Sequence, residues 1–367
     1  MTVIANAPST AVRLETLSDP ELVAHGVEQF SRELMADLAG ESEPVRRMVE
    51  AYDSVLHRGG KRTRGNLAVL GYAMLGGADK HVASVAAGAV EGLHAGLLVI
   101  DDVEDSSLTR RGGPTAHVMI EQDLKDQGAQ GDTTLKARDL ATGVGLYVQN
   151  KAQTMITDLD EVPAEWRLRT IKAVNREMML TGVGQLMDVF STTALPLTRE
   201  QIEKVALYKT AYYSFLMPLE AGALLAGAEP TDLGVLEDYS LPAGKAFQLH
   251  DDVMGVYGDE VKMGKSPKSD IIEGKQTLLI DYAMEAATPA ERAMLTRALG
   301  NGELSDTDFA VCQEIIERTG ARARVSSEAQ SLAQQAQDAL ANAPESWAAE
   351  RVQQLHSLAT FITARSV

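Results

Sequence analysis

The chain has 367 residues, of which 45% are hydrophobic and 23% charged, and its formal net charge at pH 7 is −18. Such a chain can bury a large core, but its acidity excludes a surface for nucleic acid, which needs a basic stripe to bind phosphates. A single cysteine, Cys312, excludes an internal disulfide, and no run of about 18 apolar residues predicts a membrane span. The sequence therefore predicts a cytoplasmic protein without stable membrane insertion.

Helical patterns dominate almost the whole chain. Residues 1–20 lack hydrophobic periodicity and are predicted to form a loose N-terminal leader. In residues 21–367, good helix formers prevail and apolar residues recur at spacings of three and four, which is typical of packed helices. Breaks rich in polar residues and glycine fall at 76–79, 127–133, 161–163, 191–198, 228–231, 300–306 and 343–346. We expect a single all-α domain over 21–367.

An acidic segment follows the apolar residues 97–100. It contains Asp101, Asp102, Glu104 and Asp105. Asp101 and Asp105 are four residues apart, so on a helix their carboxylates project from one face, where they repel each other mildly. Such repulsion is explained either by solvation at an outer surface or by a bound hard cation. Because the segment ends an apolar helix, we favour a cation site at the mouth of a cavity.

A second carboxylate pair, Asp251 and Asp252, also ends an apolar segment. Basic residues precede or follow the two pairs along the chain: Lys61, Arg62, Arg64, Arg110, Arg111, Lys209, Lys265 and Lys275. Any one of them alone is more often a surface residue that aids solubility. Together, basic and acidic groups suggest an anion bridged by metal, such as diphosphate oxygens on Mg²⁺ with lysine and arginine as outer ligands.

Several short segments together resemble the sequence motifs of a known enzyme family. They are Gly59–Arg64, Asp101–Asp105, Arg110–Gly112, Gly184–Gln185 with Asp188, Lys209–Thr210, Phe247–Gln248, Asp251–Asp252, Gly264–Lys265, Asp270 and Glu273–Lys275. In this order and spacing, the chain resembles trans-isoprenyl (polyprenyl) diphosphate synthases, most of all geranylgeranyl diphosphate synthases, from about residue 50 to about residue 285. The resemblance implies an isoprenoid-synthase-type bundle of helices around a central apolar cavity.

The resemblance also implies roles for individual residues. Asp101 and Asp105 are expected to hold two Mg²⁺ ions and Asp251 a third. The allylic diphosphate is expected to contact Arg110, Lys209, Lys265 and Lys275, and isopentenyl diphosphate is expected to contact Gly60, Lys61, Arg64, His94 and Arg111. Thr210 and Gln248 are expected to face the reacting carbons. For His94, the alternative is a histidine whose ring is merely satisfied within the core.

The implied reaction joins isopentenyl diphosphate to an allylic diphosphate (dimethylallyl, geranyl or farnesyl). The leaving diphosphate departs, the isopentenyl double bond attacks the allylic cation, and the cation so formed loses a proton, for which the released diphosphate is the expected base. The growing chain enters the cavity. Leu93, Gly96 and Leu97 are predicted to form the floor that sets chain length. Since glycine cannot block the cavity, we expect geranylgeranyl diphosphate, with a longer polyprenyl product as the second choice. The alternative for Gly96 is that it only permits close helix packing.

Four departures from the family pattern bear on activity. Gly255 stands where a third aspartate is common, Ile100 where histidine is common and Leu146 where aspartate is common, and the polar stretch 121–139 resembles an extended loop of some members. Gly255 and Leu146 keep open a non-catalytic subunit of a heteromeric synthase, which could tolerate both changes. A class I terpene cyclase is a further alternative, although it needs no second diphosphate site. The family resemblance implies a homodimer.

Overall fold

The computed structural model describes residues 19–193, 195–258 and 266–364. Within these ranges the chain is almost wholly helical, and its only sheet pairs β1 (Thr109–Arg110) with β2 (Gly113–Pro114) as a short antiparallel hairpin. The predicted all-α class is confirmed. The helices up to the middle of the chain are α1 (Pro20–Asp37), α2 (Glu43–His57), α3 (Thr63–Met74), α4 (Lys80–Glu104), α5 (Ala116–Asp126), α6 (Thr133–Thr157) and α7 (Ala164–Ser191).

The second half of the chain continues this pattern. Its helical elements are α8 (Arg199–Val205), the π-helix η2 (Ala206–Leu216), α9 (Met217–Leu225), α10 (Pro230–Tyr257), α12 (Ser269–Ile272), α13 (Leu278–Ala286), α14 (Pro289–Ala298), α15 (Asp306–Arg318), α16 (Ala321–Ala339), the 3₁₀ turn η3 (Leu340–Asn342) and α17 (Ala349–Ala364). The predicted leader lies outside the described residues except for Asp19, which caps α1, and Pro20, which begins it.

The breaks between helices lie where the sequence predicted them, because local capping chemistry fixes them. The side chain of Asp132 accepts the Leu135 amide hydrogen at the start of α6, and Thr198 and Gln201 form a capping box at the start of α8. One prediction was too long. Residues 121–139 are not one extended loop, since α5 continues to Asp126 and α6 begins at Thr133.

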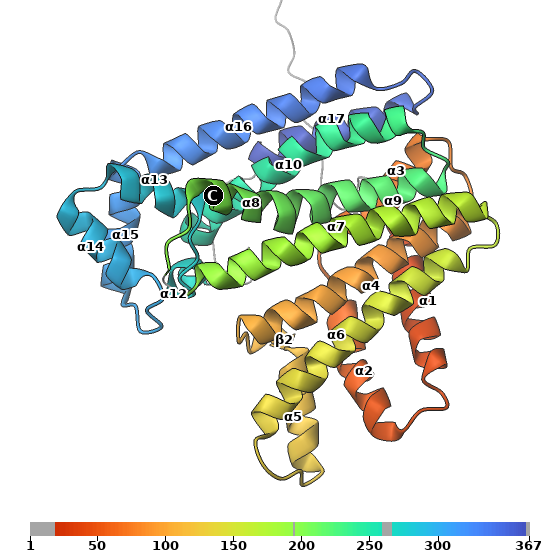
Figure 1. Ribbon diagram of the computed structural model, residues 1–367, viewed down its shortest axis with the longest axis horizontal. Coiled ribbons are helices and arrows are strands. Elements are labelled where there is room, and N and C mark those ends of the chain that lie inside the picture. Colours follow the sequence, from red (N-terminus) through yellow and green to blue (C-terminus); the bar gives the residue numbers. More distant parts are fainter. Residues whose placement is uncertain (1–18, 194, 259–265, 365–367) are drawn as a thin grey trace, which may run out of the picture.

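Helix α4 is the central element of the N-terminal half. It packs against α1, α3 and α6, and Figure 1 shows α4, α6 and α7 running beside one another. By length and composition α4 could cross a membrane, but 78% of its most apolar window is buried inside the protein. It is therefore a core helix, and its last turn carries the first acidic segment, so that Asp101 and Asp105 lie where α4 ends.

Helix α10 is the corresponding element of the C-terminal half. It packs against η2 and along α16, while α13, α14 and α15 gather at one end of the molecule (Figure 1). Cys312 is a free thiol buried among the apolar residues of this end. The face of α10 that carries Asp251 and Gln248 is thereby held opposite η2.

A buried carboxyl pair lies away from these acidic segments. Glu177 of α7 and Glu220 of α9 are both buried, and the guanidinium of Arg176 reaches both carboxyl groups. Burial, with the nearby charge of Glu220, raises the pKa of Glu177 well above the usual range of a glutamate. The pair therefore retains a proton at pH values where exposed carboxyl groups have lost theirs.

Candidate active site

Two adjoining cavities lie between the acidic segments. The smaller has a volume of about 450 Å³ and is rich in charged and amide side chains, which are Lys61, Asp188, Lys209, Gln248, Asp251, Asp252, Asp270, Lys275 and Gln276. The larger has a volume of about 770 Å³, and its apolar lining includes Leu97, Leu98, Ile100, Met178, Met179, Val183, Leu186 and Phe247. Both are lined by Lys209, Phe247, Gln248 and Asp251, so that a polar chamber leads into an apolar one.

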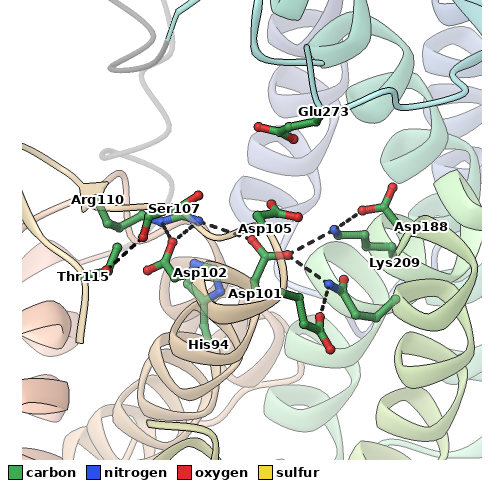
Figure 2. Close-up of polar contacts among 12 residues, drawn as sticks. His94, Asp101, Asp102, Asp105, Ser107, Arg110, Thr115, Asp188, Lys209 and Glu273 are labelled. Atoms are coloured by element: carbon green, nitrogen blue, oxygen red, sulfur yellow. Dashed lines mark hydrogen bonds and ion pairs between the residues drawn. The ribbon is translucent and has the colours of Figure 1, made fainter. Parts of the chain in front are cut away.

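Asp101 is the hub of polar contacts at the end of α4 (Figure 2). Its Oδ1 accepts hydrogen bonds from Lys209 Nζ at 3.2 Å and Gln185 Nε2 at 3.1 Å, and its Oδ2 lies 3.3 Å from Arg110 Nη2. Lys209 also donates to Asp188 Oδ2 at 2.6 Å. Burial acts to raise the pKa of Asp101, but the charges of Lys209 and Arg110 outweigh it and lower that pKa. Asp101 is therefore held as a carboxylate.

Asp105 lies one turn further along, near Lys275 and Glu273. Lys275 Nζ lies 3.6 Å from Asp105 Oδ2 and 2.6 Å from Glu273 Oε2, and Figure 2 shows Glu273 across from Asp105. Burial raises the pKa of Asp105 to about 6, with the charges of Asp101 and Glu273 adding to the effect. Charged carboxylates that are buried and repel one another are stabilised by a cation placed between them, which is the environment of a hard metal ion.

Lys209 and Thr210 reach the cavities from the π-helix η2. π-Helices are rare in proteins, and those that occur often lie at functional sites. Gly184 of α7 makes room for it, since a β-carbon at position 184 would lie 2.6 Å from the backbone nitrogen of Lys209. Thr210 Oγ1 donates to Gln248 Oε1 at 2.5 Å, which brings together the two residues predicted to face the reacting carbons.

His94 and Arg64 form a second polar cluster. Arg64 Nη1 lies 3.1 Å from His94 Nε2 and Arg64 Nη2 donates to Ser214 Oγ at 2.6 Å, while the Tyr213 hydroxyl lies 2.7 Å from His94 Nδ1. Since a guanidinium only donates, Nε2 of His94 accepts and Nδ1–H donates to Tyr213. Burial, followed by the charge of Arg64, lowers the pKa of His94 well below its usual value. His94 is therefore a neutral ring that accepts a hydrogen bond from Arg64.

The glycine pair before Lys61 shapes a third basic group. Arg111 Nη1 donates to the Gly59 carbonyl oxygen at 2.5 Å, and a β-carbon at Gly60 would lie 2.8 Å from Arg111 Cζ. Gly60 has a φ of 114°, which favours glycine. Arg62 points elsewhere, because its guanidinium bonds the buried carboxylate of Glu91. Lys61 lines the polar cavity, so this turn brings a cation to it.

Comparison with known proteins identifies the family of the chain. A sequence profile of the polyprenyl synthetase family matches residues 45–316. The chain belongs to the polyprenyl synthetase family. It is therefore a trans-prenyltransferase, and its fold is that of the isoprenoid synthases.

Three proteins illustrate the similarity. A short chain isoprenyl diphosphate synthase of Methanothermobacter thermautotrophicus is 32% identical over 79% of this chain and 81% of its own length. A geranylgeranyl diphosphate synthase of Sulfolobus acidocaldarius is 30% identical over 76% of this chain and 79% of its own length. The crystal structure of a geranylgeranyl pyrophosphate synthase from Corynebacterium glutamicum, complexed with isoprenyl diphosphate and magnesium, shares 30% identity, covers 97% of this chain and 100% of its own, and superposes with a TM-score of 0.88.

The structure revises the predicted chain-length floor of this synthase. Leu97 lines the apolar cavity, whereas Gly96 and Leu93 are not among the lining residues. Gly96 faces α6 instead, because a β-carbon there would lie 2.6 Å from Val148 Cγ2 and 3.2 Å from the Gly145 carbonyl oxygen. Leu93 is 3% exposed and belongs to the core. For Gly96 the structure supports the alternative of close helix packing.

Several residues of the synthase site were not predicted. Asp188 and Gln185 contact Lys209 and Asp101, and both stood in the matched segments, three residues apart on one helix face. Tyr213 has no comparable motif in the sequence and is recognised only because it contacts His94 and lies 4.4 Å beneath the Arg64 guanidinium. The predicted contribution of Lys265 lies outside the described residues.

Proposed function

We propose that this synthase condenses isopentenyl diphosphate with an allylic diphosphate to make geranylgeranyl diphosphate. The observation that carries the proposal is the junction of the two cavities, where Lys209, Gln248 and Asp251 border both a chamber rich in charged groups and a larger chamber whose lining is mostly apolar. A diphosphate suits the first and a polyprenyl tail the second. The geranylgeranyl diphosphate synthases among its relatives favour a twenty-carbon product.

We further propose that activity depends on Mg²⁺, held by Asp101, Asp105 and Asp251 as three ions shared with the diphosphate. Within residues 19–193, 195–258 and 266–364, no three histidine, cysteine or acidic side chains are close enough to form a metal site by themselves. Mg²⁺ is commonly bound through one or two carboxylates, waters and substrate phosphates. The donors present are carboxylate oxygens, as this ion prefers, and bound Mg²⁺ would neutralise charge that develops on the departing diphosphate.

The protein's own residues divide the remaining work. Lys209, Arg110 and Lys275, with Lys265 as predicted, would donate charge-assisted hydrogen bonds to the allylic diphosphate, in exchange for their present carboxylate partners. Isopentenyl diphosphate would contact Lys61, Arg64 and Arg111 beside the turn at Gly60, with neutral His94 fixing the Arg64 guanidinium. Thr210 and Gln248 would lie beside the reacting carbons, next to the apolar lining of the larger chamber, which would contact the hydrocarbon chain.

We also propose a homodimer formed through α6 and α7. Large apolar side chains are exposed along both helices: Leu146, Tyr147, Leu168, Met179, Val183, Leu186 and Phe190. An exposed apolar surface of this kind is typical of an interface, and a second copy carries the same surface. A cytoplasmic location is proposed with it, supported by the burial of Cys312 as a free thiol.

Product analysis tests the proposed reaction. Purified protein, Mg²⁺ and isopentenyl diphosphate are incubated with dimethylallyl, geranyl or farnesyl diphosphate in turn, and dephosphorylated products are identified by mass. A twenty-carbon alcohol from the accepted primers supports the proposal. A cyclic hydrocarbon formed without isopentenyl diphosphate indicates a terpene cyclase, and the absence of turnover with every primer indicates a non-catalytic subunit.

A further inference from the structure

A buried glutamate, Glu91, holds the turn that precedes α3. Its Oε2 lies 3.0 Å from Arg62 Nη1, and its Oε1 accepts a hydrogen bond from the Gly65 backbone amide at 2.8 Å. The Glu91 side chain is 2% exposed and comes from the middle of α4, so these contacts join two helices. Both oxygens of one buried carboxylate are thus engaged by the segment 62–65.

The conformation of the turn needs such a contact. Arg62 has a φ of 48°, in the left-handed region that residues with a β-carbon rarely adopt and that persists only where the surrounding structure holds it. Arg62 is also the N-cap of α3, but its side chain makes no capping hydrogen bond. Glu91 fills this role instead, because it accepts the Gly65 amide hydrogen in the first turn of α3.

The basic residues on either side of Arg62 are Lys61 and Arg64, both of which are expected to bind isopentenyl diphosphate. Arg64 Nη1 lies 3.1 Å from His94 Nε2. Glu91 and His94 are three residues apart on α4 and therefore share a face of that helix. One face of α4 thus holds both Arg62 and Arg64, and with them the backbone that follows Lys61.

Charge alone makes Glu91 an unfavourable neighbour for a diphosphate. Burial, followed by the charge of Arg62, lowers the pKa of Arg111, and the charge of Glu91 opposes them. Glu91 is therefore close enough to act on a cation of the isopentenyl diphosphate site, and its negative charge repels an anion bound there. A purely electrostatic role predicts that removal of this charge strengthens diphosphate binding.

We propose that Glu91 is a positioning residue for isopentenyl diphosphate, which holds Arg62 and the start of α3 so that Lys61 and Arg64 are in place to bind the diphosphate. Arg62 is then an anchor of the turn and not a ligand of the substrate. This inference rests on the proposed function, because it takes Lys61, Arg64 and Arg111 to form the isopentenyl diphosphate site. Preorganised donors bind an anion more tightly, since binding does not have to order them.

Steady-state kinetics of the full chain with Mg²⁺ and farnesyl diphosphate test the proposal in Glu91→Gln, which keeps the size of the side chain and removes its charge. KM for isopentenyl diphosphate should rise by about 10-fold to 100-fold, the range that loss of a hydrogen bond to a charged group produces in an equilibrium constant. KM for farnesyl diphosphate should stay unchanged. Calorimetric titration with isopentenyl diphosphate should show the same weakening.

Glu220→Gln is the matched control. Glu220 is likewise a buried carboxylate paired with an arginine, since its Oε2 lies 3.1 Å from Arg176 Nη2. It lies on α9 and is not among the residues that line the two adjoining cavities. Substitution there should leave both KM values unchanged.

Two competing explanations predict different results. If Glu91 only neutralises Arg62, Glu91→Gln leaves KM for isopentenyl diphosphate unchanged or lowers it. If Arg62 binds the diphosphate itself, the increases in KM caused by Arg62→Met and Glu91→Gln multiply in the double variant. The positioning role predicts that the double variant shows no larger an increase than the more affected single variant, because both substitutions break the same contact.

A loss of stability does not remove the test. If the unpaired Arg62 charge lowers the melting temperature of Glu91→Gln, the double variant Arg62→Met/Glu91→Gln removes that charge. A raised KM for isopentenyl diphosphate in the folded double variant supports the inference, and wild-type KM values overturn it while leaving the proposed function intact. A wild-type protein that neither binds nor consumes isopentenyl diphosphate would overturn the proposed function as well.

Discussion

Product length should respond to position 97 and not to position 96. The two residues are adjacent on α4, but Leu97 faces the apolar cavity while Gly96 faces Gly145 and Val148 of α6. Leu97→Phe adds a ring to the wall of a cavity of about 770 Å³ and meets open space. We expect it to shorten the main product from twenty to fifteen carbons with little loss of stability.

The effect of Gly96→Ala can be worked from the same contacts. Alanine gains about 1 kcal/mol over glycine in a helix interior, but overpacking costs about 1–3 kcal/mol. Here the new methyl group would lie 2.6 Å from Val148, which is fully buried and cannot withdraw without moving α6. The overpacking term therefore wins, and we expect a net loss of about 1 kcal/mol with an unchanged product.

Chromatography of dephosphorylated products, paired with a thermal melt of each variant, decides the question. Leu93→Ala is the companion variant. Because Leu93 is a buried core residue, this variant should lower the free energy of unfolding by about 2–5 kcal/mol without lengthening the product. A stable Gly96→Ala protein with an altered product, or a Leu97→Phe protein with the wild-type distribution, would refute the assignment of the two faces.

Three further predictions concern the charged groups. Asp101→Asn and Asp105→Asn should each stay folded but lower kcat by orders of magnitude at saturating Mg²⁺, because a carboxylate ligand is lost; near wild-type rates would remove these residues from the metal site. Lys61→Ala should raise KM for isopentenyl diphosphate more than for the allylic substrate, and Lys209→Ala should do the reverse; equal shifts for both substrates would speak against separate diphosphate sites. The pKa of Glu177 is raised in the folded protein, so its neutral form stabilises the fold at low pH, and this stability is lost as the pH rises through the raised pKa. The melting temperature of Glu177→Gln should therefore fall less than that of the wild type between pH 6 and about 9. Parallel curves for the two proteins would contradict this.

Features that depend on local sequence were predicted well. Helix breaks follow from capping residues such as Thr198, and the common face of Asp101 and Asp105 follows from their spacing on α4. The basic residues near them could be proposed because the whole ordered set of segments matched one family pattern.

Features that depend on contacts distant in the chain were not predictable. Whether Gly96 or Leu97 faces the cavity depends on where α6 packs, and periodicity along α4 does not contain that information. At Gly255 the sequence indicated only that a carboxylate is missing. The fold shows in addition that the carboxyl group of Asp270 lies against this position. The π-helix that presents Lys209 likewise has no sequence signature.

The central claim is that an allylic diphosphate ionises in the chamber rich in charged groups. Isopentenyl diphosphate, bound at a second diphosphate site, then attacks the allylic cation with its double bond. The most direct measurement is a parallel time course of isopentenyl diphosphate consumption and diphosphate release by the purified protein with farnesyl diphosphate and Mg²⁺. The account predicts equal rates and a geranylgeranyl product. Diphosphate release without isopentenyl consumption, or neither reaction, would contradict it.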